Sequence, residues 1–221
     1  MKIRRKKKIK KSSFGLFGLI IISIGIIIIS YDFILSKKEK AFNTMNIRLF
    51  DSETPVEVND NNKPDDTEVN NQVVDNQPKQ NMKVNYNYIA ILEIPKIKLK
   101  QGFLDINSKY NNVDYNITVI QTSTMPDVEN GNLILASHSG NSYISYFRNL
   151  YKLEIGDQAS IYYNNIKYTY NIVNIYNVEK NGQVAIYRNS NKTCLTLITC
   201  TKNSETEQTV YILELVDKQE Y

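Results

Sequence analysis

The chain has 221 residues, with 27 Lys and Arg against 23 Asp and Glu, and a formal net charge of +4. The first eleven residues alone carry eight Lys or Arg, so the rest of the chain is slightly acidic and shows no basic patch that would suggest nucleic-acid binding. A single His and two Cys without C-x-x-C spacing also disfavour a metal site.

The first hydrophobic segment is residues 14–35, FGLFGLIIISIGIIIISYDFIL. At about 1.5 Å per helical residue, a run of about 22 residues can cross a hydrocarbon core of roughly 30 Å. A cleaved secretory signal has a shorter apolar region and a small-residue cleavage site, and the following SKKEKAF offers no such site. The sequence predicts a basic cytoplasmic tail at 1–13, a transmembrane helix at 14–35 and an extracellular remainder, which places the protein in the cell membrane as a single-pass protein.

Residues 36–83 are polar and rich in Asn, Asp, Lys, Glu and Gln. They contain too little apolar surface to offset the entropy lost on ordering, so we expect a disordered extracellular stalk. Within it, EKAFNTMNIRLF is compatible with a short helix.

Residues 84–221 change to short runs of Tyr, Ile, Val and Thr separated by Asn and Gly, the pattern of β-strands. The hairpin signal is strongest at Asn164-Asn165, and the best helical candidate is 142–153, where apolar residues recur at three- and four-residue spacing. Strands are expected within 88–99, 132–139, 159–178, 193–200 and 208–216. Many strands and little helix predict an all-β closed barrel or sandwich in one domain.

The two cysteines, Cys194 and Cys200, stand at the ends of CLTLITC. If this segment is a strand, they are about 20 Å apart at roughly 3.3 Å per residue, whereas a disulfide needs Cα atoms within about 7 Å. They therefore serve as buried structural thiols, or one of them is a nucleophile. Cys194 is interpreted as a small buried side chain.

The only histidine, His138, ends the apolar strand pattern NLILASHS and precedes a loop signal. An isolated His is usually an ordinary surface or core residue. Together with a strand-terminal Cys it is also the pair that thiol catalysis requires. A free thiol with a pKa of about 8.5 needs a cation or a base to act at neutral pH, and a departing amine needs a proton from a general acid.

The residues Thr196 to Cys200, in LTLITC, resemble the T-L-x-T-C signature of sortases, the membrane-anchored cysteine transpeptidases of mainly Gram-positive bacteria. The segments ILEIPKIKL and NLILASHSG, and the order of His138 and Cys200, are also similar to that family. The resemblance covers 88–216 and implies a sortase-type eight-stranded β-barrel in the domain at 84–221.

The resemblance further implies a mechanism and partners. Cys200 would attack the Thr-Gly bond of a C-terminal LPxTG-like sorting signal on a surface protein, and His138 would protonate the leaving group. An amine from a peptidoglycan precursor or a pilin lysine would then resolve the thioester. No metal or organic cofactor is needed.

One position departs from the family pattern, because sortases carry an Arg on the strand after the Cys and TEQTVYILEL has none. Gln208 could donate a neutral hydrogen bond to the oxyanion. Alternatively, Arg188 could reach the site from the loop before the Cys strand, or activity is slow or lost. Arg148 is assigned to a solvated helix face.

The sequence thus predicts a class A-like or class D/E-like sortase, because the connection EKNGQVAIYRNSNK is too short for the long helix of class B. Two alternatives remain: a catalytically inactive surface-binding module on the same barrel, and a hydrolytic cysteine peptidase that uses water as the acceptor.

Overall fold

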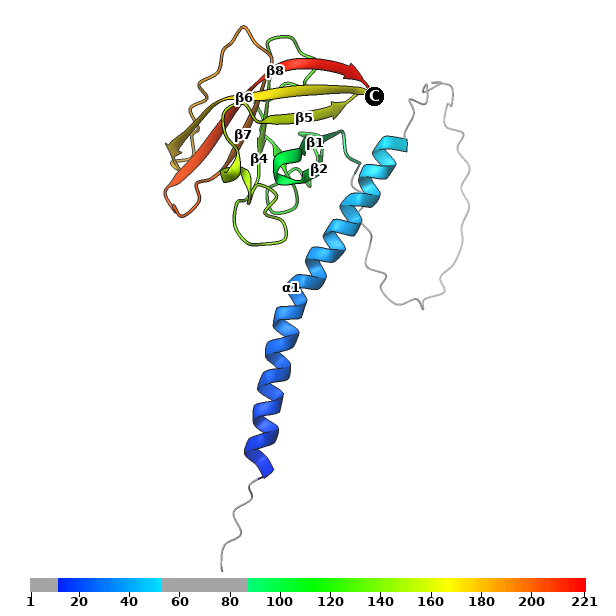
Figure 1. Ribbon diagram of the computed structural model, residues 1–221, viewed down its shortest axis with the longest axis vertical. Helices are drawn as coiled ribbons and strands as arrows, with labels where there is room; N and C mark the ends of the chain where they lie inside the picture. The colour runs from blue at the N-terminus through cyan, green and yellow to red at the C-terminus, as the bar shows by residue number, and fades with distance from the viewer. Residues whose placement is uncertain (1–11, 53–86) are drawn as a thin grey trace, which may run out of the picture.

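The computed structural model of the protein describes residues 12–52 and 87–221. A long helix leads to a β-barrel (Figure 1). Residues 1–11 of the expected basic tail and residues 53–83 of the expected stalk lie outside the described residues.

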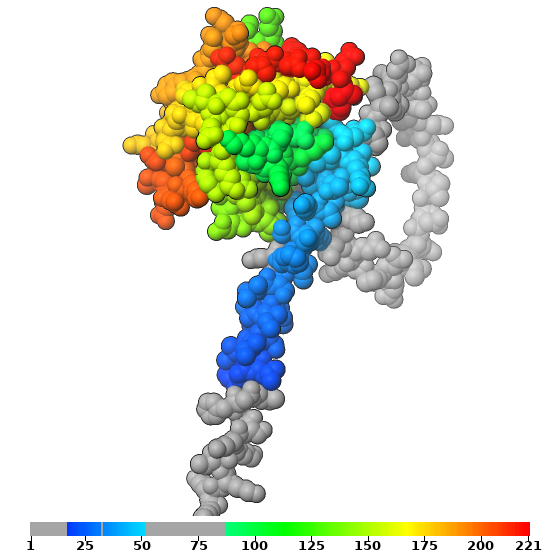
Figure 2. Space-filling model, in the orientation of Figure 1, coloured from blue at the N-terminus to red at the C-terminus, as the bar shows by residue number. Residues whose placement is uncertain are grey.

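Helix α1 (Ser12–Ser52) is longer than the sequence predicts. Its residues 17–51 include a window long and apolar enough to cross a membrane, by length and composition. Residues 36–52 are helical where disorder was expected, and they include EKAFNTMNIRLF, which the sequence left open as a short helix; they lie against the barrel (Figure 2). Asn43 Nδ2 donates to the carbonyl oxygen of Lys100 at 3.0 Å, and the Tyr146 hydroxyl donates to Glu39 at 3.0 Å. Such tertiary contacts stabilise a helix that its polar composition alone would leave marginal.

Eight strands form a single sheet with the order β2-β1-β5-β6-β8-β7-β4-β3, curved into a nearly closed barrel. The expected eight-stranded β-barrel is confirmed. The strands are β1 (Ala90–Ile94), β2 (Leu99–Phe103), β3 (Thr118–Val119), β4 (Asn132–Ala136), β5 (Gln158–Tyr163), β6 (Ile166–Glu179), β7 (Cys194–Cys200) and β8 (Glu207–Glu220). Two short 3-10 helices, η1 (Pro95–Ile97) and η2 (Leu150–Lys152), complete the described elements.

The turn between β5 and β6 confirms the hairpin expected at Asn164-Asn165. Both residues adopt positive φ, 49° and 58°, as a two-residue hairpin of type I′ requires. The strands that it joins pair in antiparallel register from Gln158↔Asn171 to Tyr163↔Ile166. Asn tolerates the left-handed region better than most residues, which explains the local signal in the sequence.

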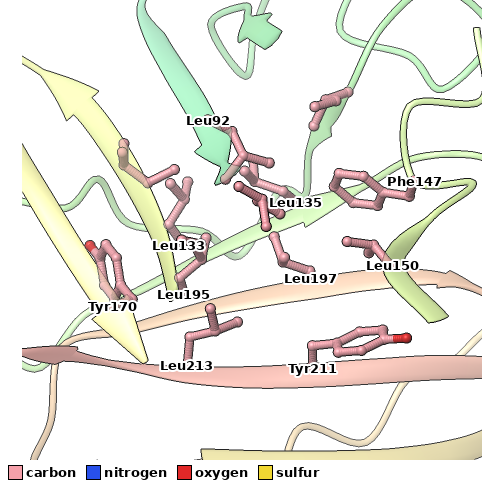
Figure 3. Close-up of a cluster of buried hydrophobic side chains, with 14 of the residues drawn as sticks. Leu92, Leu133, Leu135, Phe147, Leu150, Tyr170, Leu195, Leu197, Tyr211 and Leu213 are labelled. Carbon is pink, nitrogen blue, oxygen red and sulfur yellow. The ribbon is translucent and has the colours of Figure 1, made fainter. Parts of the chain in front are cut away.

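The barrel interior is filled by apolar side chains from the alternating inward positions of the strands. Figure 3 shows leucines of β1, β4, β7 and β8 meeting Tyr170, Tyr211, Phe147 and Leu150. Leu135, Leu195, Leu197 and Leu213 are completely buried. This packing fixes β4, β7 and β8 relative to one another.

The α-helix predicted at 142–153 is wrong. The segment makes successive turns with bonds between residues three apart, such as Arg148 N to the Ser145 carbonyl, and only η2 is helical. Phe147 N bonds back to the carbonyl of His138 at 3.0 Å, which holds the segment against the end of β4. Phe147 and Leu150 are buried, so the apolar spacing reflects two core anchors on a turn-rich loop.

Candidate active site

The parallel pairing of β4 and β7 brings His138 and Cys200 to the same end of the barrel. The two strands run in register from Asn132↔Cys194 to Ala136↔Ile198. His138 lies two residues beyond Ala136, and Cys200 lies two residues beyond Ile198. Neighbouring strands are about 4.8 Å apart, so a histidine and a cysteine widely separated in sequence become neighbours across the strand ends.

Both residues line one open hollow of about 600 Å³ at this end of the barrel. Its walls come from the segment after β4, the β7–β8 connection and the segment around Arg148 and Tyr151. A larger cavity of about 720 Å³ lies between α1 and the barrel but is lined by neither Cys200 nor His138. The smaller hollow is therefore the candidate active site.

Hydrogen bonds fix the two strand ends to each other. Ser139 Oγ donates to the carbonyl oxygen of Cys200 at 2.8 Å, and Thr199 Oγ1 donates to the carbonyl of Ser137 at 2.8 Å. Ser137 N donates to the carbonyl of Ile198 at 3.3 Å, which continues the ladder beyond the last paired residues. The backbone on which His138 and Cys200 sit is thus held from both sides, as a preorganised site requires.

The histidine ring is oriented by a carboxylate that the sequence analysis did not identify. His138 Nε2 lies 3.3 Å from Asp114 Oδ1. Because an ionised carboxylate only accepts, Nε2 carries the hydrogen of this bond. The side chains are 42% and 71% exposed, so the pair contributes little to stability, and its effect is on ring orientation.

The face of the sheet that carries Cys200 also carries Gln208 and Lys180. Cys200 pairs directly with Gln208 of β8, and Gln208 pairs with Val178 of β6. Directly paired residues point to the same face. Lys180 follows two residues after Val178, and its Nζ lies 3.8 Å from Cys200 Sγ.

Arg188 does not reach this site, which corrects the expectation that it could replace the missing arginine. Its guanidinium donates to the carbonyls of Asn130 and Lys192, next to the beginning of β4 and β7. The beginning of β7 is about 20 Å from Cys200 at roughly 3.3 Å per residue. Arg188 instead hydrogen-bonds the Cys194 thiol, whose pKa is raised by burial in spite of this partner.

Arg148 is exposed as expected, but it does not lie on a helix. It lines the hollow, where its side chain donates to the carbonyls of Ser142 and Ser145 and so closes the loop after β4.

The two cysteines are both free, as the strand geometry predicts.

Beyond Cys200, the same sheet face is apolar. Ile134, Ile198, Val210 and Ile212 form a buried cluster there. Val184 and Ile186, from the connection between β6 and β7, pack over it. A buried apolar cluster, covered by the connection between β6 and β7, therefore adjoins Cys200 on this face.

The described residues 92–216 match the family model of the sortase domain, which is more than half of the chain. The chain belongs to the sortase family. Sortases are cysteine transpeptidases, so the membership of this chain in the family agrees with a site built around a thiol.

Among solved structures, the sortase D5 transpeptidase of Clostridium perfringens is 26% identical, with a TM-score of 0.51, and the match covers 59% of this chain and 80% of that one. Sortase C1 of Streptococcus agalactiae is 24% identical, with a TM-score of 0.52 and coverage of 63% and 72%. Sortase A of Listeria monocytogenes is 20% identical, with a TM-score of 0.52 and coverage of 61% and 90%. The last two likenesses concern the fold alone. No curated protein matches the chain.

Two residues of the sortase site, Asp114 and Lys180, were missed by the sequence analysis. Asp114 precedes His138 by 24 residues in a turn-rich segment, and nothing in its local pattern signals the contact. Lys180 had a detectable signal, since it lies two residues beyond the predicted strand that ends at Val178, and alternation along that strand puts both residues on one face.

Proposed function

We propose that this sortase is a transpeptidase in which Cys200 is the nucleophile and His138 the general acid and base. The observation that carries the proposal is the register of the parallel strands β4 and β7, which brings both residues to the rim of one hollow. The sulfur adds to the carbonyl carbon of a peptide bond, and His138 gives a proton to the amine that leaves. A second amine then attacks the thioester, returns a proton to His138 and releases Cys200.

Gln208 is the proposed donor to the oxyanion. It is the direct cross-strand neighbour of Cys200 and shares its face of the sheet. Its amide N–H groups can stabilise the negative charge that develops on the carbonyl oxygen, as neutral amide donors do in other enzymes.

The proposed substrate is a C-terminal LPxTG-like sorting signal of a surface protein, cleaved between Thr and Gly. The support for this substrate is the match of residues 92–216 to the sortase domain. The proposed acceptor is an amine of a peptidoglycan precursor or a pilin lysine. A class A-like or class D/E-like enzyme of a Gram-positive cell is the corresponding assignment.

The proposed location is the cell membrane. The apolar part of α1 supports a single-pass anchor at 14–35. The eight basic residues before it favour a cytoplasmic N-terminus, which puts the catalytic domain at 84–221 outside the cell. The described outer part of the helix, up to Ser52, then belongs to the extracellular side.

Mass spectrometry of the full chain in detergent tests this proposal. The protein is incubated with LPxTG-type peptides, with and without an added amine, beside the Cys200→Ala variant. We expect a peptide–amine product and an acyl adduct on Cys200, both absent from the variant. Cleavage that yields only the free acid in the presence of amine would indicate a hydrolytic peptidase. Neither adduct nor cleavage would indicate an inactive surface-binding module.

A further inference from the structure

The Cys200 thiol lies beside a lysine that no part of the proposed reaction has used so far. Lys180 Nζ is 3.8 Å from Cys200 Sγ, within hydrogen-bonding distance for sulfur. A cation at this distance favours the thiolate over the thiol, because an opposite charge within about 4–6 Å stabilises the charged form of a titrating group. The residue directly opposite Cys200 on β8 is the neutral Gln208, which cannot supply that charge.

The backbone holds Lys180 at this position. It follows the last residue of β6, Glu179, and its N–H donates to the carbonyl of Thr206 at 2.7 Å. Thr206 immediately precedes β8, so this bond extends the β6–β8 ladder by one step past Glu179↔Glu207. The side chain therefore starts from an anchored strand end on the face that Cys200 shares.

The other cations around the hollow are directed to other partners. The Arg148 side chain donates to the carbonyls of Ser142 and Ser145. Lys202 Nζ lies 3.6 Å from the centre of the Tyr151 ring. On the opposite side, His138 is turned to Asp114. Among the described residues around the hollow, the structure thus directs Lys180 to the sulfur.

We propose that Lys180 is a catalytic residue that holds Cys200 as a thiolate, so that the charge and the oxyanion hydrogen bond come from two side chains, Lys180 directly after β6 and Gln208 on β8. This inference rests on the proposed function of Cys200 as the nucleophile. In the enzyme before substrate binds, the proton of the Cys200 thiol has then been released to the solvent. His138 does not have to accept that proton and can act as the acid.

The proton balance of the cycle follows from that assignment. The thiolate bonds to the carbonyl carbon, the C–N bond breaks, and the leaving amine takes its proton from the imidazolium of His138, which becomes the neutral imidazole. When the acceptor amine attacks the thioester, its proton goes to the neutral His138, which becomes the imidazolium again, and the C–S bond breaks with the electron pair on sulfur. Lys180 keeps its three protons throughout and again donates to the released thiolate.

The test measures the alkylation of Cys200 by iodoacetamide from pH 5 to pH 10 in the full-length protein in detergent, read by peptide mass spectrometry. We expect Lys180→Met to slow alkylation at pH 7 about tenfold and to shift the profile to higher pH, because the thiolate then lacks the ammonium that lies 3.8 Å from the sulfur. Lys180→Arg keeps the profile near that of the wild type.

Two further variants separate a charge effect from a structural one. Lys167→Met removes a lysine from the other end of the same strand, where its Nζ faces the Tyr162 ring, and leaves the profile unchanged. Gln208→Arg in the Lys180→Met background places a cation opposite Cys200 and restores alkylation at pH 7. The groups that titrate or carry charge around the thiol, His138 with Asp114, Lys202, Arg148, Glu179 and Glu207, are the same in all four variants.

An unchanged profile in Lys180→Met, or an equal slowing at every pH without recovery by the added arginine, overturns the inference. Alkylation needs no peptide, so its outcome is independent of whether a sorting signal is cleaved. A profile that depends on Lys180 in a protein that cleaves no peptide would support the stabilisation of the thiolate by Lys180 and remove the proposed function, and with it the catalytic role of Lys180. Cleavage with a profile that is independent of Lys180 would do the reverse.

Discussion

The two ends of β7 place the same side chain in opposite surroundings. Cys194, at its beginning, is 1% exposed, and its Sγ lies 3.3 Å from the Lys192 carbonyl, to which the S–H donates. Cys200, at its end, is partly exposed and lies 3.8 Å from an ammonium that donates to it. The Cys194 thiol is buried and donates to a backbone carbonyl, whereas the Cys200 sulfur is partly exposed and accepts from Lys180.

This difference shows that the surroundings of each thiol at the two ends of β7, and not the strand conformation that both share, determine how reactive the thiol is. Both cysteines lie on one face of one strand, six residues apart. The buried end is surrounded by the beginning of β4 and the carbonyls around Arg188, whereas the open end meets loops that leave a hollow. Burial raises the pKa of Cys194, even though the Arg188 hydrogen bond acts in the other direction.

The largest expected effect comes from exchanging each cysteine for alanine. Cys200→Ala removes the nucleophile and lowers the transpeptidation rate by at least about 10³-fold. Cys194→Ala leaves the rate within about threefold and lowers the free energy of unfolding by about 1–2 kcal/mol, since a buried sulfur is lost. Product formation by mass spectrometry and chemical denaturation measure the two effects. Similar rates in the two variants would remove the distinction between the strand ends.

Substitution of His138 tests the partner of the open end. His138→Ala removes the acid that protonates the leaving amine and lowers the rate by about 10²–10⁴-fold. Alkylation of Cys200 at pH 7 is retained, because the imidazole is not the group assigned to the thiolate. The rate of peptide cleavage and the rate of alkylation are measured on the same sample. A full rate of cleavage in this variant would exclude His138 as the general acid.

Labelling of the wild-type protein compares the two thiols directly. At pH 7 we expect iodoacetamide to modify Cys200 at least about tenfold faster than Cys194, since the thiolate is the reactive form and Cys194 is both buried and protonated. In denaturant the two rates become similar. The rates are read from separate proteolytic peptides. Comparable rates in the native state would show that burial does not protect Cys194.

The smallest expected effect is a pH dependence of stability at the buried end. The folded-state pKa of Cys194 is raised above its ordinary value of 9.0, chiefly by burial. Its contribution to stability is therefore complete below about pH 9 and is lost as the pH rises through the folded pKa. We expect the wild type to lose more of its Tm than Cys194→Ala between pH 8 and pH 10.5. Equal losses would contradict the assignment, because the tyrosines that also titrate there are common to both proteins.

Much of the barrel could be predicted, because its strands are short runs of β-branched and aromatic residues between turn residues and its hairpin turn uses Asn at left-handed positions. The loop after β4 was predicted wrongly as a helix. Phe147 and Leu150 satisfy a helical spacing while anchoring turns, and periodicity alone does not distinguish the two cases. The extension of α1 to Ser52 was foreseen only as a possible short helix in EKAFNTMNIRLF, since its continuity with the apolar segment is supported by contacts with β2 and Tyr146 that are distant in sequence.

For the site, the sequence predicted that His138 and Cys200 each lie at the end of a strand. It did not predict that the two strand ends are neighbours, which depends on the parallel register of β4 and β7. The position of Lys180 depends on the whole β6–β8 ladder, which contains register shifts at Thr169/Tyr170 and Ile172/Asn174. Each shift changes which residues face one another, so a cross-strand contact at the end of a 14-residue strand cannot be counted from the sequence.

The continuity of α1 has a consequence for the height at which the enzyme works. Glu39, which accepts from Tyr146, is four residues beyond Leu35, or about 6 Å along the helix axis. The segment with Tyr146 also contributes Arg148 and Asn149 to the wall of the hollow. With the proposed span ending at Leu35, the reaction takes place close to the lipid surface, where a substrate held in the same bilayer needs only a short extended segment to reach the thiol.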